Sequence, residues 1–270
     1  MPSQASPAPP TPPPPPPPSG QGPKTHAVAT GGGSALKRYQ ELIVGSRSLG
    51  FLLYFEFCSW LALVPGAAGI FLRKLFWPRL FGACGPGCVF GRGIVLRHPK
   101  RIRLGARVVI SENCILDARH SSLEEVLTIG DDGNLSNNVM ISCKEGQVRI
   151  GRHAGIGAGS IIHSTHHNPV LLGDDVILGP MCYLAGGGNY DTDDPDQPIR
   201  TRPIRRLGGI QIADNVWLAA RVTVLDGVRM GTGSIAAAGA VINRQVPEYA
   251  VCAGVPAKVV AHRKEAVHAD

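Results

Sequence analysis

The sequence has no cysteine pattern of the kind that binds a structural metal ion. Its seven cysteines are scattered singly, except for Cys84 and Cys88 in CGPGC. Because no second pair follows at zinc-finger spacing, we expect no metal site. The odd number and irregular spacing of the cysteines indicate reduced thiols and a cytoplasmic protein.

The chain also lacks an apolar run long enough to cross a bilayer. From Leu49 to Val64 it is almost wholly apolar, but Glu56 interrupts this run and Pro65 ends it. A membrane-spanning helix needs about 20 apolar residues. The N-terminus has no charged segment followed by an apolar core, so we expect no secretory signal.

No nucleic-acid-binding motif accompanies the net charge of +7, so we expect no nucleic-acid partner. The charge favours anionic partners, such as a phosphorylated cofactor or lipid headgroups.

Residues 1–35 are a tail rich in proline and glycine, with almost no apolar side chains to bury. We exclude this tail, and the C-terminal tail 263–270, from the predicted fold. The proline run predicts a solvated polyproline II segment, with a ligand for an aromatic-groove domain as the alternative.

Residues 36–83 are predicted to form an apolar helical collar. Basic residues lie among its phenylalanine and leucine side chains, namely Arg73, Lys74 and Arg79. Such a mixture suits a membrane interface. Two compatible roles remain open. The collar caps the open end of the following domain, or residues 36–81 contact the inner face of a membrane peripherally.

A six-residue period governs the chain from about Phe90. Examples are LGARVV–ISENCI, IGRHAG–IGAGSI and MGTGSI–AAAGAV, in which an aliphatic or small residue opens the six and a small residue usually follows. Helices repeat near 3.6 residues and simple strands near two, so neither explains this period. The period predicts an all-β solenoid with three short strands per coil and small residues at its corners. We expect about six coils over residues 84–262, with an insertion loop at 185–209.

The segment IADNVWLAARVTVLDGVRMGTGSIAAAGAVINRQVPEYAVCAGVPAKVV, residues 212–260, resembles the C-terminal signature of the hexapeptide-repeat acyltransferases. It is most similar to the branch of maltose, galactoside and polysaccharide O-acetyltransferases, and the resemblance extends over roughly residues 130 to 262. The resemblance implies a left-handed parallel β-helix. It also implies a homotrimer in which acetyl-CoA and the acceptor meet in clefts between subunits.

The histidine that serves as the general base in this family is absent from its usual place. The resemblance places that histidine at Gly188 or Asn189 in AGGGN. These residues hold the fifth and sixth places of their six, and His166 and His167 hold the same places one coil earlier. Because coils stack about 4.8 Å apart, we predict His166 and His167 directly beneath this position, where either imidazole could act as the catalytic base.

Two other interpretations of HSTHH remain open. The segment is a polar corner without chemistry, or it contributes to a zinc site like that of the hexapeptide-repeat carbonic anhydrases. His153 precedes it on a different face.

The remaining predicted site residues follow from the resemblance. The acceptor-binding residues are Gly187, Gly188, Asn189, Asp191, Asp194 and Arg202. The cofactor-binding residues are Trp217, Ala219, Ala220, Ala238, Gly239, Asn243, Arg244, Lys258 and Arg263. The predicted function is transfer of an acetyl group from acetyl-CoA to a sugar hydroxyl of a polysaccharide or lipid-linked glycan. The alternative is a catalytically silent β-helix that binds or scaffolds other molecules.

Overall fold

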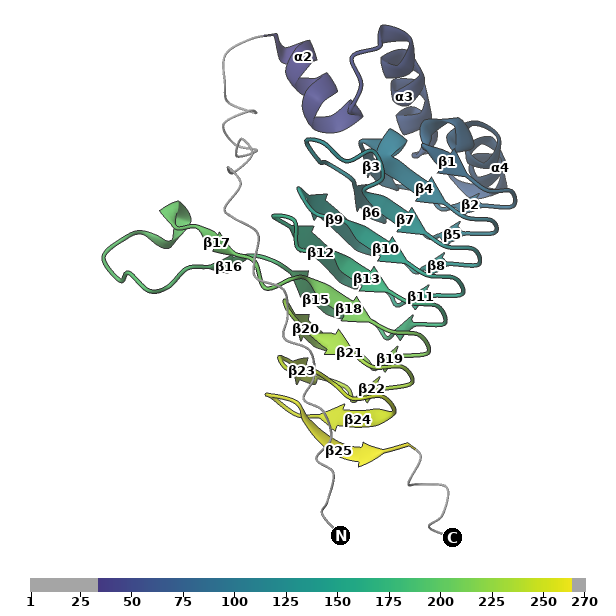
Figure 1. Ribbon diagram of the computed structural model, residues 1–270. Helices are drawn as coiled ribbons and strands as arrows, with labels where there is room; N and C mark the ends of the chain where they lie inside the picture. Colours follow the sequence, from purple (N-terminus) through teal and green to yellow (C-terminus); the bar gives the residue numbers. More distant parts are fainter. Residues whose placement is uncertain (1–33, 264–270) are drawn as a thin grey trace, which may run out of the picture.

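The computed structural model describes residues 34–263, apart from the side chain of Arg200. From Ala83 onward the chain winds into a solenoid with three faces, each a parallel β-sheet that runs the length of the molecule (Figure 1). The predicted all-β solenoid with an N-terminal helical collar is therefore confirmed. Of the predicted tails 1–35 and 263–270, residues 1–33 and 264–270 lie outside the described residues.

Each coil contributes one strand to each face. Sheet A holds β1 (Ala83–Cys84), β4 (Ile102–Leu104), β7 (Leu127–Ile129), β10 (Val148–Ile150), β13 (Val170–Leu172), β18 (Ile210–Ile212) and β21 (Arg229–Met230). Sheet B holds β2 (Val89–Phe90), β5 (Val109–Ile110), β8 (Asn134–Leu135), β11 (Gly155–Ile156), β14 (Ile177–Leu178), β19 (Trp217–Leu218), β22 (Ile235–Ala236), β24 (Ala250–Ala253) and the antiparallel β25 (Lys258–His262). Sheet C holds β3 (Val95–Arg97), β6 (Ile115–Asp117), β9 (Met140–Lys144), β12 (Ile161–Thr165), β15 (Tyr183–Gly186), β20 (Thr223–Leu225) and β23 (Val241–Ile242).

The solenoid has seven complete coils, so the expected count of about six was one too low. The additional coil is the first, which runs from Ala83 to Arg97. Its first six, CGPGCV, opens with Cys84 in place of an aliphatic residue, and this substitution hides the period there.

The residues that open the sixes point inward and make the core. In the fourth coil these are Ile150, Ile156 and Ile162, and all three are buried. Val, Cys, Ala or Ser at the fifth place is buried beside them, as at Val176 and Cys182. A single coil has too little apolar surface to fold alone, so stacking of coils supplies the hydrophobic stabilisation.

The small residue at the second place of each six is required by the neighbouring coil. A Cβ atom added to Gly151 would lie 2.3 Å from the carbonyl oxygen of Gly173, and one added to Gly130 would lie 2.7 Å from the carbonyl carbon of Gly151. The corner itself is turned at the fourth place, where the backbone adopts a positive φ, as at His153 (56°). The corner therefore depends on two separate positions rather than on one small residue.

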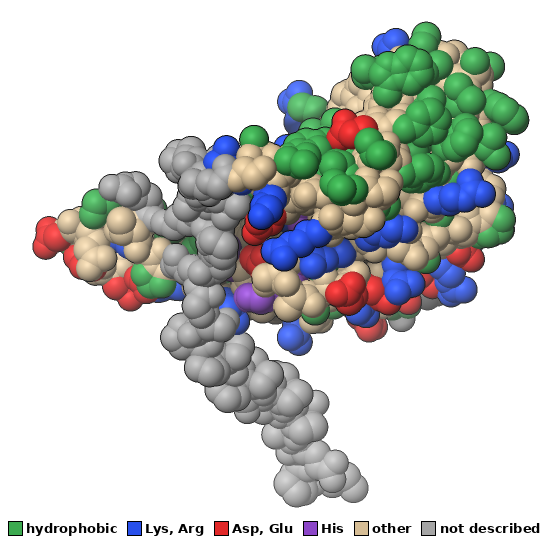
Figure 2. All heavy atoms as spheres, turned by 90° about the horizontal axis from the view of Figure 1, so that it is seen from above, with side chains coloured by type: hydrophobic (Ala, Val, Ile, Leu, Met, Phe, Trp, Pro, Cys, Tyr) green, Lys and Arg blue, Asp and Glu red, His purple; other side chains and the backbone are tan. Residues whose placement is uncertain are grey.

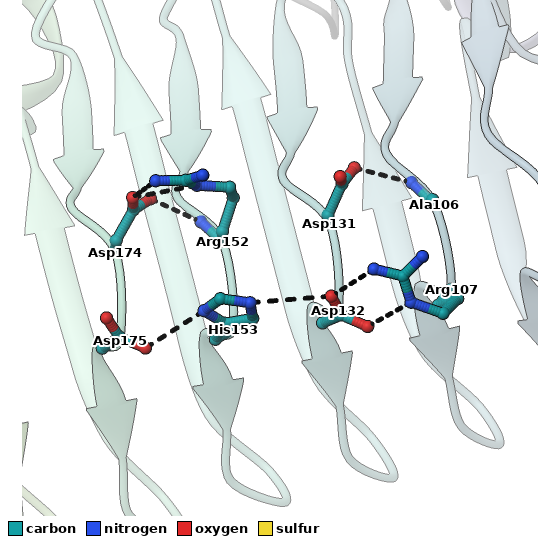
Figure 3. Close-up of polar contacts among 8 residues, drawn as sticks. All are labelled: Ala106, Arg107, Asp131, Asp132, Arg152, His153, Asp174 and Asp175. Atoms are coloured by element: carbon teal, nitrogen blue, oxygen red, sulfur yellow. Dashed lines mark hydrogen bonds and ion pairs between the residues drawn. The ribbon is translucent and has the colours of Figure 1, made fainter.

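We name the corners by the sheets that they join: the first corner joins A to B, the second joins B to C, and the third joins C back to A. Polar side chains stack along the first corner (Figure 3). Asp132 binds Arg107 through two hydrogen bonds of 2.6 Å, and His153 lies between Asp132 and Asp175. This ladder is largely exposed, so each pair adds little stability.

The helices cover the N-terminal end of the solenoid (Figure 1). They are α2 (Ala35–Tyr39), the π-helical turn η1 (Gln40–Val44), α3 (Leu49–Leu61), α4 (Gly66–Phe76) and the 3-10 turn η2 (Trp77–Leu80). Short 3-10 turns also occur at η3 (Pro99–Arg101) and η4 (Ile199–Thr201). Trp77 and Phe81 pack on the ring of Phe90 in the first coil and shield the core from water.

Arg73 was expected at the surface of the collar, but it is buried. Its side chain is buried, and its guanidinium donates to the carbonyl oxygens of Phe90 (2.9 Å), Leu61 (3.0 Å) and Val64 (2.8 Å). These carbonyls belong to the first coil, to the last residue of α3 and to the turn that follows α3. Arg73 thus joins the helices to the solenoid, because a buried charged group needs such hydrogen bonds.

We predict opposite effects for two glycine substitutions in the fourth coil. Gly151→Ala would place its Cβ against the backbone of Gly173, so the free energy of unfolding should fall by about 1–3 kcal/mol. Gly155→Ala is the matched control, because no atom lies within 4 Å of its added Cβ. Thermal unfolding followed by circular dichroism measures both. Equal melting temperatures for the two variants would contradict the proposed close contact between coils.

Candidate functional site

The third corner carries the two histidines predicted to act as bases. His166 and His167 follow β12 in the fourth coil, and their backbone N–H groups donate to the carbonyl oxygens of Lys144 and Glu145 in the third coil. Both residues have a positive φ, 51° and 62°. Such a backbone is uncommon for residues other than glycine, and the hydrogen bonds to the third coil hold it in place.

A third histidine lies beneath this pair. The ring of His120, in the second coil, contacts the ring of His167 edge-on, with 5.6 Å between the ring centres. His120 Nδ1 accepts hydrogen bonds from the N–H groups of Ser122 and Leu123, each at 3.0 Å. This nitrogen therefore carries no proton, and burial lowers the pKa of His120 in agreement.

Glu145 completes the cluster at this corner. One of its carboxylate oxygens accepts a hydrogen bond of 2.7 Å from Ser121 and lies 3.7 Å from His120 Nδ1. Sequence reasoning missed His120 and Glu145. The signal was present, because His120 and Glu145 hold the fifth place of their sixes, as His166 does.

His166 is the half-buried member of the predicted pair. Burial lowers the pKa of His166, and the nearby His167 and Arg206 lower it further, whereas Glu145 opposes the shift. The imidazole is therefore neutral near pH 7, which is the form that accepts a proton. Its Nδ1 atom is buried without a hydrogen-bond partner among the described residues.

The glycines lie above the histidine corner, as the register predicts. Ile162 pairs with Leu184 and Ser164 pairs with Gly186, so the stacking of these two coils is confirmed. A Cβ atom on Gly187 would lie 2.7 Å from the carbonyl oxygen of Thr165, whereas one on Gly188 would meet no atom within 4 Å. Gly188 therefore leaves open space at this corner.

Asn189 departs from the predicted stack because the insertion loop leaves the solenoid there. Its side chain donates a hydrogen bond of 2.9 Å to Asp226 in the sixth coil. Asp226 is buried and also accepts from the N–H of Gly209 at 2.8 Å. Burial raises the pKa of Asp226, and these hydrogen bonds oppose that rise. Hydrogen bonds to Asp226 from Asn189 and Gly209 thus connect both ends of the loop to the sixth coil.

The loop projects from the solenoid as an arm built on β16 (Asn189–Tyr190) and β17 (Ile204–Arg205), which pair antiparallel (Figure 1). Arg202 is buried inside it and donates to the carbonyl oxygens of Gln197 and Asp191. The guanidinium of Arg202 is thus occupied by carbonyl groups of the arm, and its predicted binding of the acceptor stays a prediction. Asp191 pairs with Arg205 at 3.0 Å, whereas Asp194 is exposed.

The predicted cofactor residues fall into three groups. Trp217 lies on the outer face of sheet B and is 49% exposed. In the first group with it are the residues of the adjoining second corner, Ala219, Ala220, Ala238 and Gly239, and Lys258 on β25, which β22 and β24 separate from β19 in the same sheet. Asn243 and Arg244 follow β23 at the third corner. Arg263 lies instead at the first corner, where its Nη1 donates to the carbonyl of Gly233 at 2.8 Å. The structure therefore separates Arg263 from the main group.

The residues that the structure describes contain no group of three or more His, Cys, Asp or Glu side chains arranged to hold a metal ion. His153 is at the first corner and His166 is at the third, on opposite edges of sheet A. A hollow of about 440 Å³ lies on the outer face of sheet A, lined in part by Arg149, Leu171 and Arg229. It includes none of the predicted site residues, so we centre the candidate site on the third corner.

Comparison with known proteins gives three relatives that are named as acetyltransferases. The chain is 28% identical over 138 residues to a probable acetyltransferase of Mycobacterium tuberculosis, covering 51% of this chain and 45% of that protein. It is 33% identical over 104 residues to a provisionally named acetyltransferase of Saccharomyces cerevisiae, covering 38% and 53%. WbbJ of Escherichia coli K12 is provisionally named a lipopolysaccharide biosynthesis O-acetyl transferase. The chain is 30% identical to it over 104 residues, covering 37% of this chain and 53% of WbbJ.

The predicted resemblance to acetyltransferases is confirmed. The chain spans about half the length of the curated relatives that it matches. No family model matches it. Among solved structures, LpxA from Acinetobacter baumannii matches with a TM-score of 0.53 and 17% identity, covering 68% of this chain and 64% of that one. This is a likeness of fold, and the expected left-handed parallel β-helix is confirmed with it.

We predict that the His166 imidazole titrates below the ordinary histidine value of about 6.5. Arg206→Gln should raise its midpoint, because the substitution removes a cation that disfavours protonation. Glu145→Gln should lower the midpoint, because it removes an anion that favours protonation. Nuclear magnetic resonance of the ring protons during a pH titration measures all three midpoints. A wild-type midpoint at or above 6.5 would show that burial and the neighbouring cations do not lower the pKa of this imidazole.

Proposed function

We propose that this protein is an acetyl-CoA-dependent O-acetyltransferase that moves an acetyl group to a sugar hydroxyl of a polysaccharide or lipid-linked glycan. The similarity to acetyltransferases and the β-helix support acyl transfer. The acetyl group and the sugar acceptor follow from the resemblance of residues 212–260 and from the name of the Escherichia coli relative. The observation that carries the proposal is the half-buried imidazole of His166, whose Nδ1 has no hydrogen-bond partner among the described residues and which lies one coil below the open corner at Gly188.

In the proposed reaction, His166 accepts the proton of the acceptor hydroxyl. The hydroxyl oxygen then attacks the thioester carbonyl, and a tetrahedral oxyanion forms. When this intermediate collapses, the C–S bond breaks and the ester forms. The protonated imidazole returns its proton to the departing thiolate, so the products are the acetylated sugar and free CoA. His167 is the second candidate for this role, and its ring rests on His120.

The arrangement of the predicted donor residues supports a homotrimer. Ala219, Ala220 and Ala238 are at the second corner, whereas the histidines are at the third, across sheet C. The outer face of sheet C exposes apolar side chains, including Val95, Ile161 and Tyr183. We propose that a neighbouring copy covers this face and brings its donor residues to the histidine corner.

A second candidate function is a catalytically silent β-helix that binds CoA or a glycan. The observation that favours it is the engagement of Asn189 with Asp226, since in the family a histidine stands at Gly188 or Asn189. Release of free CoA separates the two functions. The enzyme releases CoA from acetyl-CoA in the presence of sugar acceptors above a no-enzyme control, and the silent protein does not.

We predict that His166→Ala lowers the rate of acetyl transfer by roughly 10²–10⁴-fold, which is the usual contribution of a general base. Mass spectrometry of the acetylated sugar, with a panel of mono- and oligosaccharide acceptors, measures this rate. His153→Ala is the matched control, because His153 is held at the first corner between two aspartates. If both His166→Ala and, separately, His167→Ala keep the wild-type rate, neither imidazole is the base.

We predict that Trp217→Ala weakens binding of CoA by roughly two- to twelvefold, because an aromatic contact contributes about 0.5–1.5 kcal/mol. Isothermal titration calorimetry measures the dissociation constant without turnover. Trp60→Ala is the control, because Trp60 is an exposed tryptophan on α3, at the other end of the molecule. Unchanged affinity in Trp217→Ala would place the cofactor away from sheet B.

A further inference from the structure

The helices that cover the solenoid expose a continuous set of large apolar side chains on their outer surface. Seen along the solenoid from this end, the hydrophobic residues gather over the helices, and lysine and arginine side chains line one flank (Figure 2). We call this surface the cap face. Its members are Leu36, Tyr39, Leu49, Leu53, Phe57, Trp60, Leu63, Ile70, Phe71 and Leu75.

Helix α3 shows why the cap face is unusual. Its inner side, with Leu52, Phe55 and Cys58, is buried on the solenoid. Its outer side is also apolar, with Leu53 71% and Trp60 66% exposed. A helix on the surface of a soluble protein normally presents polar residues outward, and an apolar patch of this kind marks an interaction surface.

The charges around the cap face identify the kind of partner. Residues 34–81 contain six basic residues and two acidic ones. Lys37, Arg47, Lys74 and Arg79 are exposed. The two acidic residues, Glu41 and Glu56, are also exposed, and Glu56 accepts a hydrogen bond of 2.5 Å from the Tyr39 hydroxyl, so the exposed charge of the segment is positive on balance. A basic rim around leucine, phenylalanine and tryptophan complements an anionic bilayer, where headgroups meet the cations and the acyl chains meet the apolar residues.

The same helices are fixed to the solenoid. The backbone N–H of His98, in the first coil, donates to the carbonyl of Ile43 at 2.9 Å, and His98 Nε2 lies 2.8 Å from the carbonyl oxygen of Glu41. Among the described residues, no single helix is long and apolar enough to cross a membrane, and one pair bent by 66°, Ala35–Val44 with Leu49–Leu61, passes by length and composition. Because this pair is bound to the first coil, its outer side is placed to lie on a bilayer rather than to cross it.

We propose that the cap face is a peripheral membrane-binding surface for anionic lipid bilayers. The outer side chains of α3 and α4 enter the boundary between headgroups and acyl chains, and the basic rim binds the anionic headgroups. The solenoid then stands away from the bilayer on the opposite side of the helices. This inference does not depend on the proposed acetyl transfer.

Co-sedimentation of the full-length protein with lipid vesicles tests this surface. Vesicles of phosphatidylcholine alone are compared with vesicles that also contain phosphatidylglycerol. We expect the wild type to bind the anionic vesicles more strongly, with binding that weakens as salt rises. The double variant Leu53→Glu/Trp60→Glu should reduce binding by roughly tenfold or more, because it removes two inserted side chains and adds two repelled charges.

Ile199→Glu/Leu207→Glu is the matched control, since both residues are exposed apolar residues of the arm and the added charge is the same. Circular dichroism establishes that each variant is folded. Three results overturn the proposal: no binding of the wild type to either vesicle, equal binding of the cap variant and the wild type, or equal losses in the cap and arm variants. If the wild type does not bind vesicles and the cap variant differs from it in oligomeric mass, the cap face is instead a contact with a second copy of the chain.

Discussion

Backbone hydrogen bonds between successive coils determine the position of nearly every residue discussed above. In the fourth coil, the N–H of Gly151 donates to the carbonyl oxygen of Leu172 in the fifth coil, and the N–H of Gly155 donates to the carbonyl oxygen of Val176 in the same coil as Leu172. Because this pairing repeats on all three faces, residues at the same place in successive sixes form columns. The core, the ladder at the first corner and the histidine cluster at the third corner are all such columns. Chemistry in this fold therefore requires suitable residues in consecutive coils rather than in one loop.

The period of six was sufficient to predict the solenoid and the register that places Gly187 above Thr165. It did not reveal the path of the arm, because the arm leaves the column at Asn189 and its geometry depends on contacts between distant residues. The hydrogen bond between Asn189 and Asp226 joins the fifth and sixth coils. The burial of Arg202 results from carbonyl groups that only the folded arm brings together.

The helical end of the molecule posed a different difficulty. A basic residue among phenylalanines suggests a surface, yet Arg73 is buried because three carbonyl groups surround its guanidinium. Lys74, its neighbour in sequence, is exposed. Adjacent cations thus have opposite environments, and only the direction of each side chain on α4 distinguishes them. Propensity and composition carry no information on that direction until the helix is placed against the first coil.

The stacking of coils also fixes the distance of each residue from the capped end of the solenoid. The helices cover the first coil, and His166 belongs to the fourth, so three coil spacings of about 4.8 Å separate them, or about 14 Å. A substituent held at the third corner would therefore stand at a fixed height from the capped end, whatever the acceptor's chemical structure. Insertion or removal of one coil would alter that height in steps of one strand spacing. The number of coils before the histidines is thus a quantity on which selection could act independently of the residues at the corner.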